Sequence, residues 1–169
     1  MTTKTRTIST LAAAGLAMAG LGTAPALADP GHTVSTTVNQ HGTFQIPGAT
    51  DFCTGEAINP TITGNSVFHI TYFPGGDEFW LTETTEGTGS FVQPSTGLTF
   101  SGRVTVWDNF NQNNQNSNST FTATFKLTAV DSLGVTHTET GHITAHVAYS
   151  AADPTNPTVS FFNFNATCS

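Results

Sequence analysis

The residues best suited to acid–base chemistry are carboxylic acids that fall on apolar faces of the sequence pattern. Glu83 continues an alternating apolar face that includes Phe79 and Leu81, and Glu139 follows the same face as Ile143. A carboxyl group that points into an apolar interior has a raised pKa and can exchange a proton near neutral pH, as glycoside cleavage requires. A hydrolase or cyclase of this kind would use four candidate catalytic residues: Glu56, Glu83, His137 and Glu139.

Other observations argue against an enzyme. Glu83 and Glu139 lie at the ends of the expected strands, where a carboxylate usually reaches water, and a bulge at Gly141 would switch the register of the residues before it. The sequence has no G-x-S-x-G or H-E-x-x-H motif, no phosphate-binding loop and no dinucleotide-binding fingerprint. We therefore assign no catalytic residue and favour a protein that is not an enzyme.

Histidine is the residue type that would most readily form a metal site. Two of the histidines, His142 and His146, have the i, i+4 spacing of a zinc pair, but that spacing converges on one metal only from a helix. On a strand, four residues span about 13 Å. We therefore expect no metal site and no cofactor. The full set of histidines is His32, His41, His69, His137, His142 and His146.

A second group of side chains falls on the opposite, polar face of the expected strands. Both tryptophans belong to it, among threonines. Exposed aromatic rings on a threonine-rich sheet are suited to stacking on sugar rings or to contact with a protein partner. The alternative is that they pack beneath a loop or a second layer. The candidate ligand-binding residues are Trp80, Trp107, Arg103, His69 and His142.

Alternation of apolar and polar residues predicts strands along almost the whole chain. Residues 120–130 show it best, and the sequence Pro-Gly-Gly-Asp at 74–77 predicts a hairpin between two such runs. The pattern predicts an all-β fold, a single antiparallel β-barrel or β-sandwich of about eight or nine strands. Residues 87–97, rich in Gly, Thr, Ser and Pro, and residues 109–119, rich in Asn and Gln, are expected to be loops.

Length and charge limit the possible functions. The chain has 169 residues, 4 Lys and Arg against 11 Asp and Glu, a net charge of −7, and only 9% charged residues. That length suits one ordinary domain. Nucleic-acid binding is excluded as a serious hypothesis because neutralising phosphates requires a basic patch.

The first 28 residues have the features of a secretory signal peptide. A basic start at Lys4 and Arg6 precedes a short apolar run, and Ala26-Leu27-Ala28 supplies the small residues that a signal peptidase accepts. We expect cleavage near Ala28, a secreted single all-β domain over residues 29–169, no membrane span and a monomer. Loss of Lys4 and Arg6 would change the net charge from −7 to −9.

Cys53 and Cys168 are the only cysteines, and both lie in the expected mature chain. Export favours their oxidation, and no further cysteine is available to complete a thiolate metal site. We therefore expect one disulfide that closes a loop of about 115 residues, which the chain-entropy model values at about 4 to 5 kcal/mol at most.

One motif resembles a known group of proteins. Asp51-Phe52-Cys53-Thr54-Gly55-Glu56, followed by Ile62-Thr63-Gly64 and His69, resembles a pattern in small, exported, uncharacterised proteins of actinobacteria with a late cysteine near the end. The resemblance implies an extracellular β-fold with a Cys53–Cys168 bridge and no particular activity. It also implies a structural role for Glu56, buried beside the bridge and bonded to backbone amides.

Three functional hypotheses follow. The first is a secreted binding module for a neutral or apolar small molecule in a barrel, or for a glycan on the face that carries Trp80 and Trp107. The second is an enzyme in a barrel cavity, with Glu83, His137 or Glu139 acting together with Glu56. The third is a structural or cell-surface protein without a small ligand. We favour the first.

Overall fold

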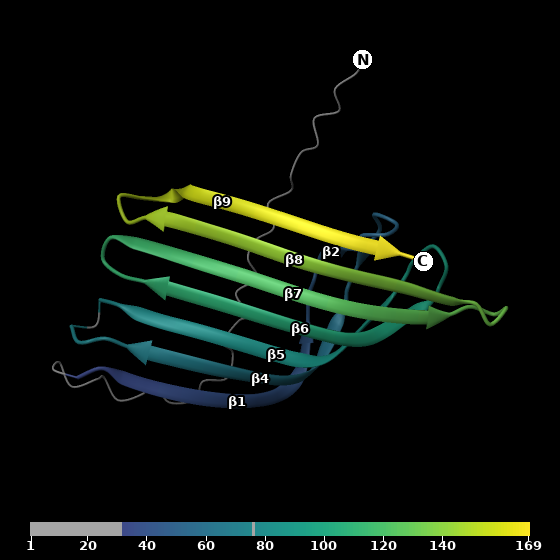
Figure 1. Ribbon diagram of the computed structural model, residues 1–169, viewed down its shortest axis with the longest axis horizontal. Coiled ribbons are helices and arrows are strands. Elements are labelled where there is room, and N and C mark those ends of the chain that lie inside the picture. Colours follow the sequence, from purple (N-terminus) through teal and green to yellow (C-terminus); the bar gives the residue numbers. More distant parts are fainter. Residues whose placement is uncertain (1–31, 76) are drawn as a thin grey trace, which may run out of the picture.

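The computed structural model describes residues 32–75 and 77–169, and in this part of the chain all regular structure is β-strand (Figure 1). The expected signal peptide, residues 1–28 with cleavage near Ala28, lies outside the described residues. The strands are β1 (Val34–Gln45), β2 (Ala49–Thr50), β3 (Ala57–Ile58), β4 (Thr61–Tyr72), β5 (Phe79–Val92), β6 (Thr99–Gln112), β7 (Asn116–Val130), β8 (Thr136–Ser150) and β9 (Asp153–Cys168). Within these ranges no helix is long and apolar enough to cross a membrane.

Seven of the strands form one antiparallel sheet in the order β1-β4-β5-β6-β7-β8-β9, and β2 and β3 form a small second sheet. Apart from the step from β1 to β4, neighbours in this sheet are also neighbours in the sequence, as expected for strands joined by hairpins. The predicted hairpin at 74–77 joins β4 to β5. The prediction of an all-β, antiparallel fold with about eight or nine strands and one disulfide is confirmed.

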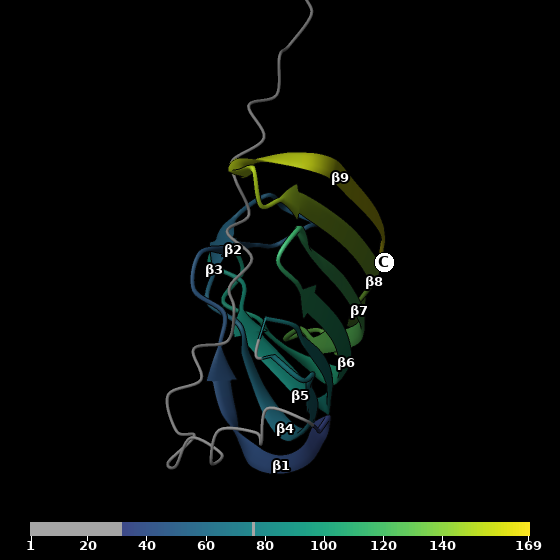
Figure 2. The same ribbon diagram turned by 90° about the vertical axis from the view of Figure 1, so that its left-hand side faces the viewer.

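The large sheet is strongly curved but stays open. Figure 2 shows it as a trough, with β1 and β9 at its two rims and the segment that carries β2 and β3 beside its concave side. Among the described residues, β1 pairs only with β4 and β9 only with β8, so the sheet does not close into the barrel that the sequence allowed. A two-stranded second sheet is also too small to form half of an ordinary sandwich.

Glycines in the strands let neighbouring backbones approach closely. Gly42, Gly64 and Gly87 face one another across β1, β4 and β5. A Cβ atom on Gly64 would collide with the carbonyl oxygen of Glu86, and one on Gly87 with that of Thr63. The predicted loop at 87–97 was therefore wrong in its first half, because β5 continues through these glycines to Val92. In this strand the glycines mark close backbone approach and not a turn.

The predicted loop at 109–119 is also much shorter than expected. β6 extends to Gln112 and β7 begins at Asn116, which leaves a three-residue connection. The side chains of Asn111 and Asn118 exchange two hydrogen bonds across the strands, at 2.9 and 2.6 Å. The Asn113 side chain accepts hydrogen bonds from the backbone N–H groups of Gln115 and Asn116, both at 2.9 Å. Here asparagine stabilises the hairpin because its amides pair across the strands and close the turn.

The hydrophobic core lies between one half of the concave face and residues 46–60, which cross over it. Ile58 of β3 packs against concave residues of the large sheet, with buried side chains from β4 to β7. The disulfide between Cys53 and Cys168 fastens this covering segment to the end of β9, with the two Cα atoms 5.9 Å apart. The buried apolar residues of this cluster are Ile58, Ile62, Phe91, Phe100, Val104, Val106, Ala123, Leu127 and Ala129.

Candidate functional site

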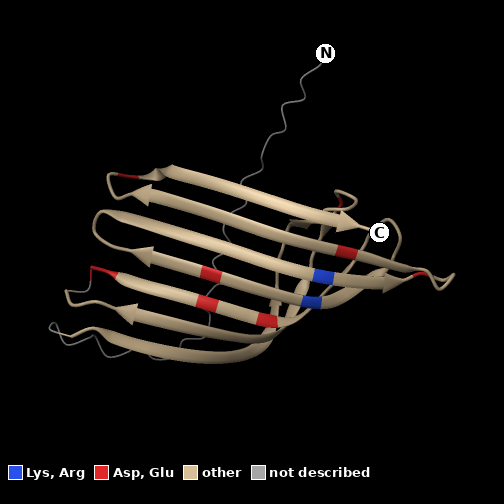
Figure 3. Cartoon of the chain, viewed as in Figure 1, with Lys and Arg blue, Asp and Glu red and all other residues tan. Residues whose placement is uncertain are grey.

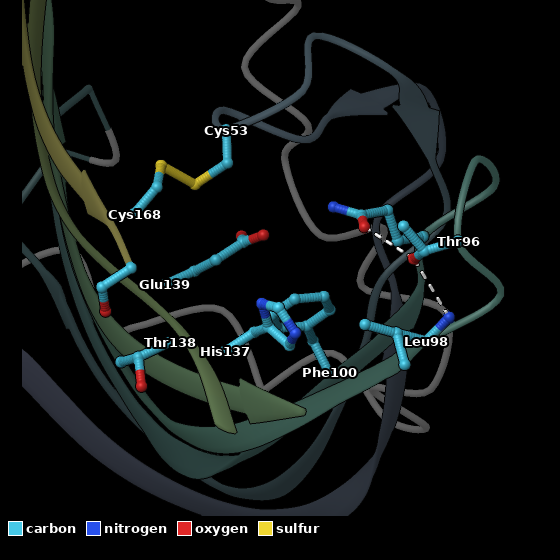
Figure 4. Close-up of a pocket in the computed structure, with 10 residues that line it drawn as sticks. Cys53, Thr96, Leu98, Phe100, His137, Thr138, Glu139 and Cys168 are labelled. Atoms are coloured by element: carbon cyan, nitrogen blue, oxygen red, sulfur yellow. Dashed lines mark hydrogen bonds between the residues drawn. A yellow bond between two sulfur atoms is a disulfide. The ribbon is translucent and has the colours of Figure 1, made fainter. Parts of the chain in front are cut away.

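A cavity of about 300 Å³ lies beside the disulfide, where the covering segment meets the concave face. Figure 4 shows residues of its lining: the His137 and Phe100 rings overlap at the centre of the view, Leu98 lies to their right, and the Cys53–Cys168 bridge lies above the Glu139 carboxyl. This volume lies at the lower end of the range for small-molecule sites. The lining combines the apolar surface of Leu98, Phe100 and the disulfide with a few polar groups, which is typical of a small-molecule site. The polar residues are Gln93, Thr96, His137, Thr138, Glu139 and Ser169.

The register of the sheet points His137 and Glu139 into this cavity. They are alternate residues of β8, and Glu139 is directly opposite Cys168 of β9. The pairing of β7 with β8 is continuous from Thr136 to Ser150, so there is no bulge at Gly141. The expectation that Glu139 reaches water at a strand end was wrong: the residue is only 5% exposed. Pairing with β9 and the bridge to Cys53 together cover it.

The Glu139 carboxyl is held close to a second, ionised carboxylate. Asp51 is buried, and burial alone would raise its pKa. Its carboxylate accepts hydrogen bonds from the Gln93 side-chain amide at 2.9 Å and from the backbone N–H groups of Cys53 and Thr54 at 2.8 and 3.2 Å. These bonds outweigh the effect of burial, so the pKa of Asp51 is lowered. Burial, and then the negative charge of Asp51, raise the pKa of Glu139 to about 7. At neutral pH the Glu139 carboxyl is therefore protonated in a large fraction of molecules.

The Glu139 carboxyl makes no hydrogen bond to another described residue, whereas the Asp51 carboxylate accepts three. Neither carboxyl group has a fully buried oxygen that lacks a hydrogen-bond partner. The Glu139 carboxyl borders the cavity. A protonated carboxyl offers one donor and an acceptor. Both are available to a molecule in the cavity.

The same carboxyls do not form a metal site in this oxidised protein. Ligand atoms of Asp51, Cys53 and Glu139 lie within 4.8 Å of one another. However, the Cys53 sulfur is bonded to Cys168, and only a thiolate is a strong zinc ligand. Two carboxylates remain, which are too few ligands for a zinc site.

His137 lines the cavity, and its side chain contacts the turn between β7 and β8. Its Nε2 atom is 3.1 Å from Oδ2 of Asp131. Asp131 also accepts hydrogen bonds from the backbone N–H groups of Val135 and Leu133, each at 2.9 Å. The Val135 bond and then the contact with His137 lower the pKa of Asp131. His137 is therefore held in place by the turn, two residues along β8 from Glu139.

The other two candidate catalytic residues lie outside the cavity. Glu56 is half-buried and connects two loops, since it accepts hydrogen bonds from the hydroxyls of Ser95 at 2.8 Å and Thr54 at 3.2 Å, and from the Ser95 backbone N–H at 3.4 Å. Glu83 lies on the concave face of β5, within the strand and not at its exposed end. Of the four predicted residues, only His137 and Glu139 line one cavity.

Glu83 has an acidic neighbour that the sequence analysis missed. Asp108 of β6 is directly opposite it. Burial raises the pKa of Glu83, and the negative charge of Asp108 raises it further. The hydroxyl of Thr85 donates a hydrogen bond to Glu83 at 2.8 Å, which opposes this shift. Burial also raises the pKa of Asp108. Alternation from Val104 and Val106 places residue 108 on the same inward face, so this pair was detectable once the strand was extended past residue 107.

The candidate ligand-binding residues lie on the convex face, as their pattern predicted, but they are spread over it. Trp80 is 49% exposed and Trp107 is 39% exposed. Trp107 is opposite Thr84, four residues along β5 from Trp80, so the two rings are offset by about 13 Å along the strands. His69 and His142 lie on β4 and β8, where their Nδ1 atoms are each 3.0 Å from a threonine hydroxyl.

The two cations of the described chain are neighbours on this face. Arg103 of β6 is directly opposite Lys126 of β7, and Figure 3 shows them side by side. Arg103 is 3.7 Å from Glu86, but both side chains are largely exposed, so this ion pair contributes little to stability.

No family model, curated protein or solved structure matches the chain.

Replacing Glu139 by glutamine is expected to make the protein less sensitive to pH. The pKa of Glu139 is raised from 4.5 to about 7, so its contribution to stability is complete below about pH 4.5 and is lost as the pH rises through 7. At pH 8, Glu139→Gln should raise the free energy of unfolding by about 1 to 2 kcal/mol after allowance for solvent screening, and at pH 5 by much less. Urea denaturation at the two pH values measures this difference.

The matched control is Glu86→Gln, which removes an exposed carboxylate from the convex face. Its effect should stay within about 0.5 kcal/mol at both pH values. Equal effects of Glu139→Gln at pH 5 and pH 8 would show that Glu139 is not the group that titrates.

Proposed function

We propose that this chain is a binding protein that holds a small, neutral and mainly apolar molecule in the cavity beside the disulfide. The observation that carries the proposal is the Glu139 carboxyl. It is buried, it borders a cavity lined by Leu98 and Phe100, and it makes no hydrogen bond to another described residue. A ligand with one carbonyl, amide or hydroxyl group would pair with this carboxyl, while its apolar part covers the two side chains.

Charge favours a neutral ligand. Asp51 is ionised close to Glu139, and the whole chain has a net charge of −7. An anion in the cavity would be repelled by Asp51 and would lose its hydration without a nearby cation, since Arg103 and Lys126 lie on the opposite face of the sheet. The location that suits such a protein is outside the cell, which the disulfide and the expected leader at residues 1–28 both support.

Catalysis is the weaker hypothesis for this site. Two of the four candidate acid–base residues, Glu56 and Glu83, lie outside the cavity. His137 remains, but its Nε2 atom is engaged by Asp131. A buried carboxyl with a pKa near 7 is as well suited to donating a hydrogen bond to a bound molecule as it is to acid–base catalysis. Binding requires only the groups that line the cavity.

Glycan binding on the convex face is a second candidate function. The observation in its favour is that both tryptophans are substantially exposed on one threonine-rich face. Because the two rings are offset along the strands, each would stack on a different sugar of an extended chain. If neither site binds a small ligand, the hypothesis of a structural or cell-surface protein remains.

The cavity is tested by nuclear magnetic resonance titration with small neutral probes such as benzamide and cyclohexanone. We expect saturable shifts in the amide signals of His137 and Glu139, and loss of binding in Leu98→Trp, whose larger side chain fills the cavity. Val67→Trp adds similar bulk to the exposed convex face and should bind normally. Probe binding that is unaffected by Leu98→Trp would contradict the proposal. Soluble glycans titrated against tryptophan fluorescence test the second candidate in the same preparation.

A further inference from the structure

The outer rim of the sheet at β9 has an unpaired backbone edge among the described residues. β9 is 16 residues long and pairs on one side with β8, and every residue in it is exposed except Phe164, which is half-buried. Figure 1 shows it as the last strand of the sheet, on the side away from β1. A long strand edge of this kind presents N–H and C=O groups that can pair with another strand.

The side chains of this edge lack the usual protection against such pairing. From Pro154 to the end of the sequence there is no charged residue. Val159, Phe161 and Phe162 are all about half exposed. Prolines and an irregular register protect only the start of the strand, at Pro154 and Pro157. Soluble proteins usually place lysine, proline or a bulge along exposed edges, so residues 159–166 form an edge suited to contact.

We propose that β9 pairs with β9 of a second copy of this chain, antiparallel and about a two-fold axis. Antiparallel pairing joins residues that lie on the same face of the sheet. If Ser160 is opposite its own counterpart, Val159 of each copy is opposite Phe161 of the other. This register therefore forms two aromatic–β-branched pairs on the convex face, a combination that stabilises sheets.

The opposite rim is a poorer partner. The outward-facing residues of β1 are polar, and its apolar residues Val34, Val38 and Phe44 are half-buried on the concave face. A contact between two β9 strands uses the same surface on both copies, so it closes as a dimer and does not extend into a filament. The proline-free pairing centred on Ser160 covers residues 158–162 of each copy, which leaves Cys168 and the cavity outside the paired segment. This inference is independent of the proposed ligand, and it replaces the monomer expected from the sequence.

Sedimentation equilibrium over a broad range of concentrations tests the proposal. The purified chain should have twice the mass of one chain, and Phe161→Lys should reduce it to a single chain because each copy would bring a cation to the paired strands. Val67→Lys places the same charge at an exposed apolar site of β4 and should remain dimeric. A single-chain mass at every concentration, or an equal loss of dimer in both variants, would overturn the proposal.

A cross-linking variant keeps the test decisive if Phe161→Lys does not fold. Ser160→Cys should form a disulfide with its counterpart on mild oxidation, because directly opposed residues in adjacent strands lie within disulfide reach. Ser35→Cys on β1 is the control and should stay mostly monomeric. Equal cross-linking of the two variants would count against pairing at β9. Failure of either result leaves the ligand proposal unaffected, since the cavity is outside the contact.

Discussion

Replacing both Cys53 and Cys168 by serine is expected to lower the free energy of unfolding by about 4 kcal/mol. The bridge spans 115 residues, so it removes much of the conformational freedom of the unfolded chain, and the loop-entropy relation gives about 4 to 5 kcal/mol as an upper value. Domains of this size have total stabilities of about 5 to 15 kcal/mol. The loss is therefore a large fraction of the whole, and urea denaturation of the double variant beside the wild type measures it.

The double variant should also lose the cavity. Cys53 fastens residues 46–60 over the concave face, and the bridge covers the Glu139 carboxyl. With the bridge removed, water reaches that carboxyl and its pKa should fall from about 7 towards 4.5. Reduction of the wild-type protein is the control and should reproduce both effects. A loss of less than about 1 kcal/mol would show that packing alone holds the covering segment in place.

Gly87→Ala is expected to destabilise the protein by about 3 kcal/mol or more, although alanine usually stabilises a strand relative to glycine. The new Cβ atom would collide with backbone atoms of Thr63 and Gly64, which cannot move aside as a flexible side chain can. The strands would have to separate, with loss of hydrogen bonds between β4 and β5. Thermal unfolding measures the loss, which corresponds to a fall in Tm of roughly 10 °C for a domain of this size.

Gly42→Ala is the matched control, because Gly42 lies in the same row of paired residues as Gly64 and Gly87. Its Cβ atom would meet only the Phe44 ring, at an ordinary contact distance of 3.6 Å. This substitution should be neutral or stabilise by up to about 1 kcal/mol. If both alanine variants have the same stability, close backbone approach is not the reason for glycine at position 87.

Local patterns were sufficient to predict much of the fold. Alternation from Thr120 to Val130 fixed which residues of β7 face inward, and the prediction holds residue by residue in the sheet. The turn at 74–77 predicted the β4–β5 hairpin, and two cysteines in a chain expected to be exported predicted one disulfide. Each of these inferences depends only on residues close in sequence, or on having a single possible pair.

Long-range contacts were beyond the same reasoning. The partner of Gly87 is Gly64, on another strand, so composition alone made residues 87–97 resemble a loop. Asn111 and Asn118 likewise lie in the ends of β6 and β7, where their side chains exchange hydrogen bonds across the strands. Whether the sheet closes depends on curvature accumulated over seven strands, which no short pattern specifies.

The candidate site was predicted in part. Alternation placed Glu139 on an inward face, but its burial depends on Cys168 opposite it and on the covering segment. Asp51 and Gln93 were missed because they are 42 residues apart and form their hydrogen bond only in the folded chain. Glu56 was grouped with the catalytic candidates from its position beside Cys53, yet its hydrogen bonds lead to Ser95 on another loop.

The central claim is that the protonated form of the Glu139 carboxyl, present in a large fraction of molecules at neutral pH, anchors a neutral ligand in the cavity. It is tested most directly by the affinity for cyclohexanone, which can only accept a hydrogen bond, as a function of pH, measured by nuclear magnetic resonance for the wild type and Glu139→Gln. The wild type should bind tightly below pH 6 and lose affinity as the pH rises through 7, since an ionised carboxyl can no longer donate a hydrogen bond. Glu139→Gln should bind with an affinity that does not change over this range, because its amide keeps a donor. Equal pH dependence in the two proteins, or no binding by either, would contradict the account.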